Sequence, residues 1–180
     1  MGNAAALNSF LAGVERRAFR MARYAVSDTE AAMDIVQDAM LTLARKYAAR
    51  PESEWPPLFF RILRNRITDF HRRRIVQNGI FALLPGRRDG PVEADPMDQV
   101  AGARDTEPEF RNELDRATQR LNIALAQLPA RQREAFLLRA WEGLDVAGTA
   151  RAMRCSEGSV KTHYSRAVHK LREQLEGDWS

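Results

Sequence analysis

The chain has 180 residues, enough for one domain or for two small ones. Its 28 Lys and Arg side chains exceed its 24 Asp and Glu side chains by a net charge of only +4, so charge matters where it is unevenly placed. A single cysteine excludes an intrachain disulfide, and no apolar run suits a signal peptide or approaches the roughly 18 residues of a membrane span. We therefore expect a cytoplasmic protein without direct membrane insertion.

The first 47 residues show helical periodicity. Apolar residues at alternating spacings of three and four predict an amphipathic helix over residues 4–25. A second predicted helix begins at Ser27, which has the spacing of a capping box with Glu30, and runs to about Tyr47. The expected apolar seam of this second helix consists of Met33, Val36, Met40, Leu43 and Tyr47.

Prolines interrupt the pattern next. Three prolines and a tryptophan within residues 48–57 predict a loop. A third helix is expected over about residues 58–74, with Phe59, Leu63, Ile67 and Phe70 buried. Three such helices offer enough apolar surface for a small bundle.

The charged residues after this point are grouped by sign. Residues 61–74 carry six arginines against a single acid, whereas residues 89–109 carry seven acids against a single arginine. Between residues 79 and 108, Pro–Gly pairs and sparse apolar residues predict a linker, with one short helical piece near residues 97–101.

Helical patterns resume at about residues 109–127, and Pro129 opens a further helix over about residues 130–141. A short helix, a tight turn at residues 154–156 and a longer helix that opens at Ser156 complete the chain. No segment shows convincing strand alternation. The sequence predicts an all-α fold of two small helical domains joined by a flexible acidic linker, with a first domain at 1–77, the linker at 78–108 and a second domain at 109–180.

The last helix has two unlike faces. Its apolar face carries Val160, Tyr164, Ala167, Val168, Leu171 and Leu175. The opposite face presents donors to phosphates or base edges, namely Lys161, Thr162, Ser165, Arg166 and Lys170. Two helices joined by a short turn, the second with such a face, are typical of a helix-turn-helix that enters a DNA major groove. An ordinary amphipathic hairpin with a solvated basic face is the alternative.

Several motifs together resemble one family. Residues 128–139 (LPARQREAFLLR), residues 142–144 (EGL) and the helix-turn-helix resemble region 4 of bacterial RNA polymerase sigma factors. Residues 34–40 (DIVQDAM) resemble region 2.2, and residues 60–74 resemble regions 2.3 and 2.4. A chain with these two regions and a short connector resembles an extracytoplasmic-function (group IV) sigma factor.

The resemblance implies a dissociable sigma factor that directs core RNA polymerase to specific promoters and assists promoter opening, in response to stress or an envelope signal. It implies three partners, namely core RNA polymerase, promoter DNA at its −35 and −10 elements, and an anti-sigma factor. The acidic linker matches the family segment that threads the polymerase cleft, although a plain solvated tether explains its residues equally well.

The resemblance also assigns sites. Core polymerase binding falls on Asp34, Gln37 and Asp38, which share one polar helix face, although a solvated face is the ordinary explanation of such a group. Contacts to the −10 element fall on Arg61, Arg64, Asn65, Arg72 and Arg73. Contacts to the −35 element fall on Ser159, Lys161, Thr162, Ser165 and Arg166.

Nearby residues add to these assignments. The loop at residues 48–55 matches the family segment that captures a flipped base, an event that costs a few kcal/mol. Phe59, Phe60 and Phe70 are able to stack on unpaired bases, but Phe59 and Phe70 stand at the spacing of core residues.

Four residues depart from the family pattern. Leu58 stands where many members carry tryptophan. Gly148 and Thr149 lie inside the first helix of the helix-turn-helix, where an apolar branched residue is usual, and glycine costs about 1 kcal/mol there. Arg154 occupies the turn where glycine is common, and a left-handed conformation would cost an arginine about 1–2 kcal/mol.

Two other classes of function fit the sequence less well. A LuxR-type helix-turn-helix regulator carries a phrase like residues 160–163, but it needs an upstream receiver or ligand domain of alternating strands and helices. A nuclease would need a phosphate-cradling glycine loop or carboxylates beside a histidine, and the sequence shows neither. We expect no catalytic residue, no metal site and no cofactor.

Overall fold

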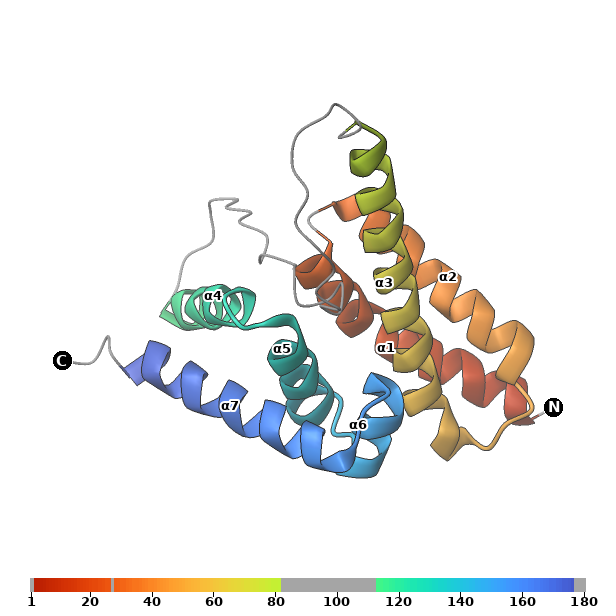
Figure 1. The fold of residues 1–180 in the computed structure, drawn as a ribbon. Helices are drawn as coiled ribbons and strands as arrows, with labels where there is room; N and C mark the ends of the chain where they lie inside the picture. The colour runs from red at the N-terminus through yellow and green to blue at the C-terminus, as the bar shows by residue number, and fades with distance from the viewer. Residues whose placement is uncertain (1, 27, 82–112, 177–180) are drawn as a thin grey trace.

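The computed structural model describes residues 2–26, 28–81 and 113–176, which form helices and their connections (Figure 1). The predicted all-α class is confirmed. In chain order the elements are α1 (Gly2–Ala25), α2 (Thr29–Tyr47), the 3₁₀ turn η1 (Glu52–Glu54), α3 (Trp55–Phe81), α4 (Glu113–Ala126), α5 (Ala130–Phe136), the π-helical turn η3 (Leu137–Trp141), α6 (Val146–Met153) and α7 (Glu157–Glu176).

Helix α2 begins later than the sequence predicted. Its N-cap is Asp28, whose carboxylate accepts a hydrogen bond of 3.0 Å from the Ala31 amide. An aspartate in this place satisfies one of the helix amides that lack a partner in the first turn. The predicted capping box at Ser27 is therefore wrong in register, and Ser27 itself lies outside the described residues.

The buried stripe of α2 is also rotated from the predicted seam. Val36 and Leu43 are buried as expected, but Met33 is 50% exposed. The stripe consists of Ala32, Ile35, Val36, Ala39 and Leu43. Small alanines at positions 32 and 39 let α1 and α3 approach α2 closely, so the stripe turns toward them.

Helix α3 starts inside the segment predicted to be a loop. Pro56 and Pro57 occupy its first turn, where a missing amide hydrogen leaves no helical bond unmade. Trp55 is only 1% exposed, and its indole nitrogen donates to the Tyr47 carbonyl at 3.2 Å. The connection between α2 and α3 is thus shorter than predicted and ends before Trp55.

Helix α3 also continues to Phe81, so the first residues of the predicted linker are helical. The remainder of that linker, with its expected helical piece at residues 97–101, lies outside the described residues. So do residues 109–112 of the next predicted helix, which the structure describes from Glu113 as α4.

The helix-turn-helix forms as predicted. Helix α6 ends at Met153, and the φ of 53° and ψ of 49° at its C-cap, Arg154, place that residue in the left-handed region. Ser156 then caps α7, because its hydroxyl accepts a hydrogen bond of 3.1 Å from the Ser159 amide. Among the residues that the structure describes, no helix combines the length and apolar character needed to cross a membrane.

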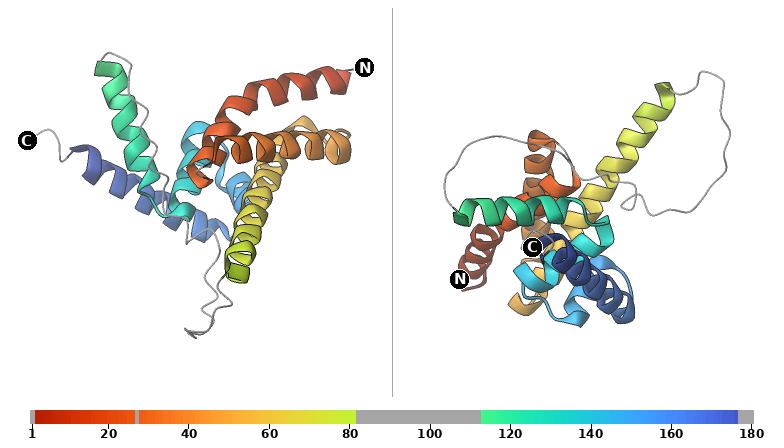
Figure 2. Two further views of the ribbon diagram at one scale, coloured as in Figure 1. Left: turned by 90° about the horizontal axis from the view of Figure 1, so that it is seen from above. Right: turned by 90° about the vertical axis from the view of Figure 1, so that its left-hand side faces the viewer.

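The N-terminal helices α1–α3 and the C-terminal helices α4–α7 pack against each other. Figures 1 and 2 show α6 beside α3, with α7 beyond it. One apolar core joins the two sets, since residues such as Phe60 and Leu63 of α3 belong to the same buried cluster as Leu138 and Met153. This packing was not predicted from the sequence.

Candidate nucleic-acid interface

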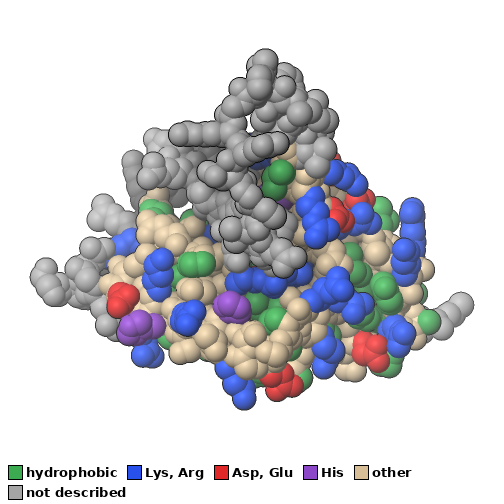
Figure 3. Space-filling model, in the orientation of Figure 1, with side chains coloured by type: hydrophobic (Ala, Val, Ile, Leu, Met, Phe, Trp, Pro, Cys, Tyr) green, Lys and Arg blue, Asp and Glu red, His purple; other side chains and the backbone are tan. Residues whose placement is uncertain are grey.

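The outer face of α7 is open to solvent. Lys161, Thr162, Ser165 and Arg166 are exposed, while Val160 and Ala167 on the opposite face are 1% and 0% exposed. Figure 3 shows Lys and Arg side chains spread across this side of the molecule, with few acidic ones among them. The helix therefore presents cations and hydroxyls on a surface that a DNA groove can reach.

Two hydroxyls of the predicted −35 set also serve the helix itself. The Ser159 hydroxyl lies 2.9 Å from that of Ser156, and Ser159 is half-buried. The Thr162 hydroxyl donates to the Gly158 carbonyl at 3.0 Å. The side chains that point outward without such a role are those at Lys161, Ser165 and Arg166.

The tilt of α7 is fixed by contacts that the sequence analysis did not find. The Tyr164 ring stacks on Phe136 with centroids 6.1 Å apart and an interplanar angle of 16°. The Arg139 guanidinium lies 5.7 Å from the centre of the Tyr164 ring, and it also donates to the Leu144 carbonyl. Arg139 reaches α7 from within the π-helical segment Leu137–Trp141. A sequence pattern with the α-helical period of 3.6 residues does not predict such a segment.

The glycine in α6 has a local cause. Asp145 caps this helix by accepting a hydrogen bond of 2.6 Å from the Gly148 amide. A Cβ atom at position 148 would stand 2.8 Å from the same carboxylate oxygen. Thr149 is fully buried, and its hydroxyl donates to the Asp145 carbonyl at 2.8 Å. Gly148 and Thr149, which depart from the family pattern, thus both bond to Asp145 at the N-terminal cap of α6.

The arginine-rich helix α3 divides into two parts. Arg72 and Arg73, near its C-terminal end, are exposed, whereas Arg61, Arg64 and Asn65 are half-buried. The structure therefore does not bring the predicted −10 residues together on one open surface.

The aromatic residues of α3 belong mainly to the core. Phe59 is 0% and Phe60 is 3% exposed, and their rings meet edge to face at 5.2 Å. Phe70 is half-buried beside His71. The core assignment of Phe59 is confirmed, and no base can stack on Phe59 or Phe60 in this arrangement.

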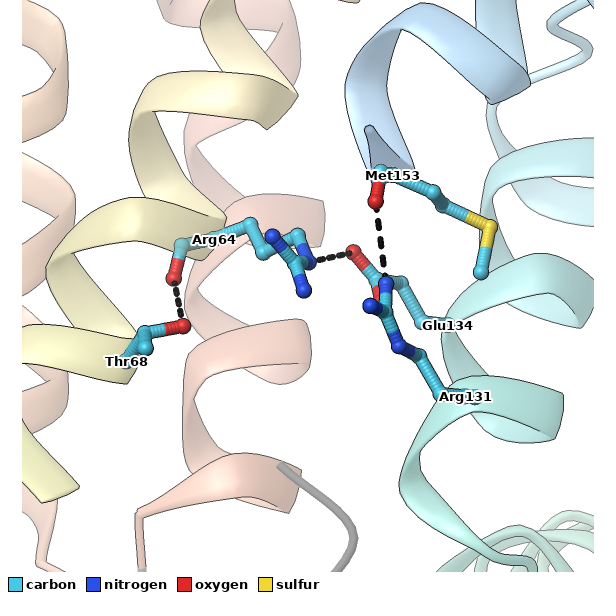
Figure 4. A network of polar contacts seen from close by, with 5 residues as sticks. All are labelled: Arg64, Thr68, Arg131, Glu134 and Met153. Carbon is cyan, nitrogen blue, oxygen red and sulfur yellow. Dashed lines mark hydrogen bonds and ion pairs between the residues drawn. The ribbon is translucent and has the colours of Figure 1, made fainter. Parts of the chain in front are cut away.

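Arg64 meets a carboxylate from the C-terminal helices. Its Nε lies 3.3 Å from Oε1 of Glu134 on α5, and the two side chains are 11% and 8% exposed. Glu134 also pairs with Arg131 at 3.6 Å, and Arg131 donates to the Met153 carbonyl at 2.9 Å. Figure 4 shows Glu134 between the two arginines. One carboxylate thus links α3, α5 and the end of α6.

The predicted polymerase-binding residues lie together on α2. Asp34, Gln37 and Asp38 are all exposed, on a face that also carries two exposed apolar side chains, Met33 and Leu41, each 50% exposed. Exposed apolar groups mixed with carboxylates suit a protein partner better than they suit DNA.

Two half-buried titratable groups, His71 and Glu142, stand outside these faces. Burial lowers the pKa of His71, opposed by a hydrogen bond to the Ala25 backbone. Burial raises the pKa of Glu142, opposed by the Arg17 guanidinium at 2.9 Å. No group of three His, Cys, Asp or Glu side chains among the described residues is placed to hold a metal ion.

Comparisons with known proteins match both halves of the chain. The family model for Sigma-70 region 2 matches residues 10–75, and that for Sigma-70, region 4 matches residues 118–171. An RNA polymerase sigma-E factor of Streptomyces antibioticus is 33% identical over 151 residues, which cover 84% of this chain and 74% of that protein. The ECF RNA polymerase sigma factor SigM of Mycobacterium tuberculosis is 30% identical over 165 residues, covering 89% and 72%.

Solved structures agree. The sigma factor RpoE of Bartonella quintana, in complex with the anti-sigma factor NepR, matches with a TM-score of 0.62 and 26% identity, over 94% of this chain and 96% of that one. CnrH, in complex with the cytosolic domain of CnrY, shares the fold with a TM-score of 0.57 and 22% identity, over 98% and 92%. The LuxR-type alternative fails, because residues 2–26 and 28–81 are helical rather than an alternation of strands and helices.

Proposed function

Because this chain belongs to the extracytoplasmic-function sigma factors of the sigma-70 family, we propose that three of its surfaces divide the work of a dissociable polymerase subunit. Members of this family are non-catalytic. We assign region 2 to residues 1–77, the linker to residues 78–108 and region 4 to residues 109–180. We place the protein in the cytoplasm, acting under stress or an envelope signal.

The outer face of α7 reads the −35 element. The observation that carries this proposal is the exposure of Arg166 and Lys161 on the second helix of a formed helix-turn-helix, whose opposite face buries Val160, Ala167 and Leu171. Arg166 offers a guanidinium fork that matches the paired acceptors of guanine, whereas Lys161 offers a point charge that suits a phosphate. Ser159, Thr162 and Ser165 complete this surface.

Helix α3 and the connection before it act on the −10 element. Arg61, Arg64, Arg72 and Arg73 supply cations for the strand backbone, and Asn65 is the candidate base contact. The segment that captures a flipped base is confined to residues 48–54, because Trp55 belongs to the core. A replacement of residues 48–54 or an Asn65→Ala substitution should reduce permanganate reactivity of −10 thymines, and wild-type promoter opening by both would exclude this role.

The outer face of α2 binds core polymerase. Asp34, Gln37 and Asp38 supply polar contacts there, and the exposed Met33 and Leu41 supply apolar area. The sigma factor RpoE was solved with the anti-sigma factor NepR, and we propose that a protein of that class restrains this chain.

Transcription with purified core polymerase tests the function. The chain should direct initiation from a subset of random promoter templates that core polymerase alone ignores. A Gln37→Ala, Asp38→Ala double variant should lose core binding in a pull-down at unchanged helical content, whereas Glu30→Ala, an exposed change at the start of α2, should not. Undiminished binding by the double variant would remove the α2 assignment.

A further inference from the structure

The end of α6 carries two arginines that belong to none of the surfaces assigned above. Arg151 and Arg154 stand three residues apart, so their side chains lie on the same side of the helix end. Both are exposed, whereas Ala152 and Met153 between them are 0% exposed. Neither guanidinium bonds to any other residue that the structure describes. Two cations therefore face solvent at the turn of the helix-turn-helix.

Arg154 holds a conformation that favours glycine. Its φ of 53° lies in the left-handed region, where a Cβ atom crowds the carbonyl oxygen that follows it. The turn itself needs only the backbone, because the amides of Arg154 and Cys155 both donate to the Ala150 carbonyl. Glycine would make the same bonds without strain. The fold gains nothing from the arginine side chain, and a strained residue of this kind points to a use outside folding.

The two arginines border a shallow, open hollow between α6 and the start of α7. Six residues line it, namely Ala147, Ala150, Arg151, Arg154, Cys155 and Glu157. Alanine side chains are too short to keep a neighbouring molecule away, so a ligand can approach α6 closely within reach of the guanidinium groups. Two arginines against the single acid Glu157 leave the hollow with a net positive charge. It therefore suits a narrow anionic ligand.

The hollow lies beside the face of α7 that we assign to the −35 element. Helix α7 begins at Glu157, three residues after Arg154, and Lys161 follows about 6 Å further along its axis. In a bound helix-turn-helix the second helix lies in the major groove while the first crosses the DNA backbone. Since the groove is only about 12 Å wide, a residue at the turn before α7 stands at the wall of the groove, where the phosphates are.

A backbone phosphate of that wall matches the chemistry of Arg154. A guanidinium donates paired N–H bonds to two phosphate oxygens, and such charge-assisted pairs are strong. Contacts of this kind carry no base preference. An acidic protein surface would offer similar acceptors, but a duplex bound to α7 would already fill the space beside the turn. The position of the hollow thus favours DNA.

We propose that Arg154, assisted by Arg151, binds a backbone phosphate at the edge of the −35 element, and that this chain gains DNA affinity there at the expense of stability. The proposal rests on the assignment of the outer face of α7 to the −35 element. It extends the DNA surface from α7 to the turn and the end of α6. Arg166 then supplies base preference, and Arg154 supplies affinity for any sequence.

Three variants at position 154 separate charge from strain. Arg154→Asn removes the guanidinium but keeps a residue that tolerates the left-handed region. Arg154→Gly removes both the charge and the strain, and Arg154→Lys keeps the charge. The matched control is Arg120→Asn, the same change of charge on an exposed side chain of α4.

The readout is binding of holoenzyme, reconstituted from the full chain and core polymerase, to a linear duplex with a promoter selected from random templates. Each phosphate contact contributes about 0.9 to the slope of log affinity against log salt concentration. Arg154→Asn and Arg154→Gly should lower that slope by about 0.9 and weaken binding about eightfold at roughly 0.1 M salt, with every −35 base preference unchanged. Arg154→Lys should retain most of the slope, and Arg120→Asn should retain all of it.

The contact can also be located on the DNA. A neutral methylphosphonate is placed in turn at each phosphate that flanks the −35 element. At one position it should weaken wild-type binding about eightfold yet leave the affinity of Arg154→Asn unchanged, because the arginine that loses its partner is already absent. Arg151→Gln should weaken wild-type binding less than Arg154→Asn does.

Two results would overturn the proposal. One is a wild-type salt slope and affinity in Arg154→Asn, which would leave an acidic protein as the ligand of the hollow. The other is an equal response of wild type and Arg154→Asn to the methylphosphonate at every position. A folding defect is excluded as a cause of weak binding, because Arg154→Gly should bind DNA less tightly while it unfolds at higher urea concentration.

The outcome is distinguishable from failure of the proposed function. Unchanged base preference in Arg166→Ala would remove the assignment of α7 to the −35 element. Altered base preference in Arg166→Ala, together with a wild-type slope in Arg154→Asn, would remove the phosphate contact alone.

Discussion

Replacing Arg154 with glycine should make the protein more stable. Arg154 is the non-glycine residue with positive φ among the described residues, at the left-handed end of α6. Its amide and that of Cys155 both donate to the Ala150 carbonyl, the latter at 3.2 Å, and neither bond involves a side chain. The arginine side chain is exposed, so its removal sacrifices little packing.

The size of the gain follows from two opposing terms. A left-handed conformation costs a residue with a Cβ about 1–2 kcal/mol, which glycine avoids. Glycine loses about 0.4–1 kcal/mol more chain entropy on folding. The difference is a gain of about 0.5–1 kcal/mol in the free energy of unfolding, or about 1–4 °C in Tm.

A matched control gives the opposite sign. Arg151 is exposed within α6, where glycine should cost about 1 kcal/mol of helix stability. Urea denaturation followed by circular dichroism should therefore order the proteins as Arg154→Gly above wild type above Arg151→Gly. A loss of stability by Arg154→Gly equal to that of Arg151→Gly would refute the reasoning.

Three further outcomes are expected. Arg166→Ala should cost about 1–3 kcal/mol in binding of the holoenzyme to promoter DNA and relax the base preference at one −35 position, and an unchanged preference would contradict the assignment. Lys161→Ala should instead weaken binding to all promoter sequences alike and lower the slope of log affinity against log salt concentration by about one. Burial lowers the pKa of His71, so the folded state binds this proton less readily, and the free energy of unfolding should fall as the pH drops below about 6.5. This fall, measured by urea denaturation between pH 7 and 5, should be smaller in His71→Asn, and an equal fall would exclude His71 as its source. Trp55→Ala should cost about 3–5 kcal/mol in the same assay, and a cost below 1 kcal/mol would show that Trp55 is not part of the core.

The sequence predicted best where the two faces of a helix differ most. On α7, most charged and apolar residues stand on opposite faces, so the buried face at Val160 and Ala167 followed from spacing alone. On α2 the spacing of apolar residues predicted that Met33 is buried because methionine is apolar, whereas the structure buries the small Ala32 instead. Side-chain size, rather than polarity, decides which face approaches a neighbouring helix.

Two other features lay beyond pattern analysis for definable reasons. The paired prolines at 56 and 57 indicated a loop, although proline is equally acceptable in a first helical turn. The face of α1 at Arg17, Arg20 and Tyr24 carries no sequence pattern that distinguishes it from a solvated surface, because charged residues usually are solvated. Its contact with region 4 depends on partners more than 90 residues away, which no local spacing encodes.

The position of α6 constrains how such a chain can diverge. This helix packs on α3 with one side and on α7 with another, so it belongs at once to the DNA-reading unit and to the contact between regions. If the outer face of α7 reads the −35 element as proposed, substitutions there can change promoter preference without disturbing that contact. A substitution in α6 has to preserve packing against both α3 and α7. Over evolutionary time we expect related regulators to acquire new promoters through α7 while α6 varies slowly and in step with α3.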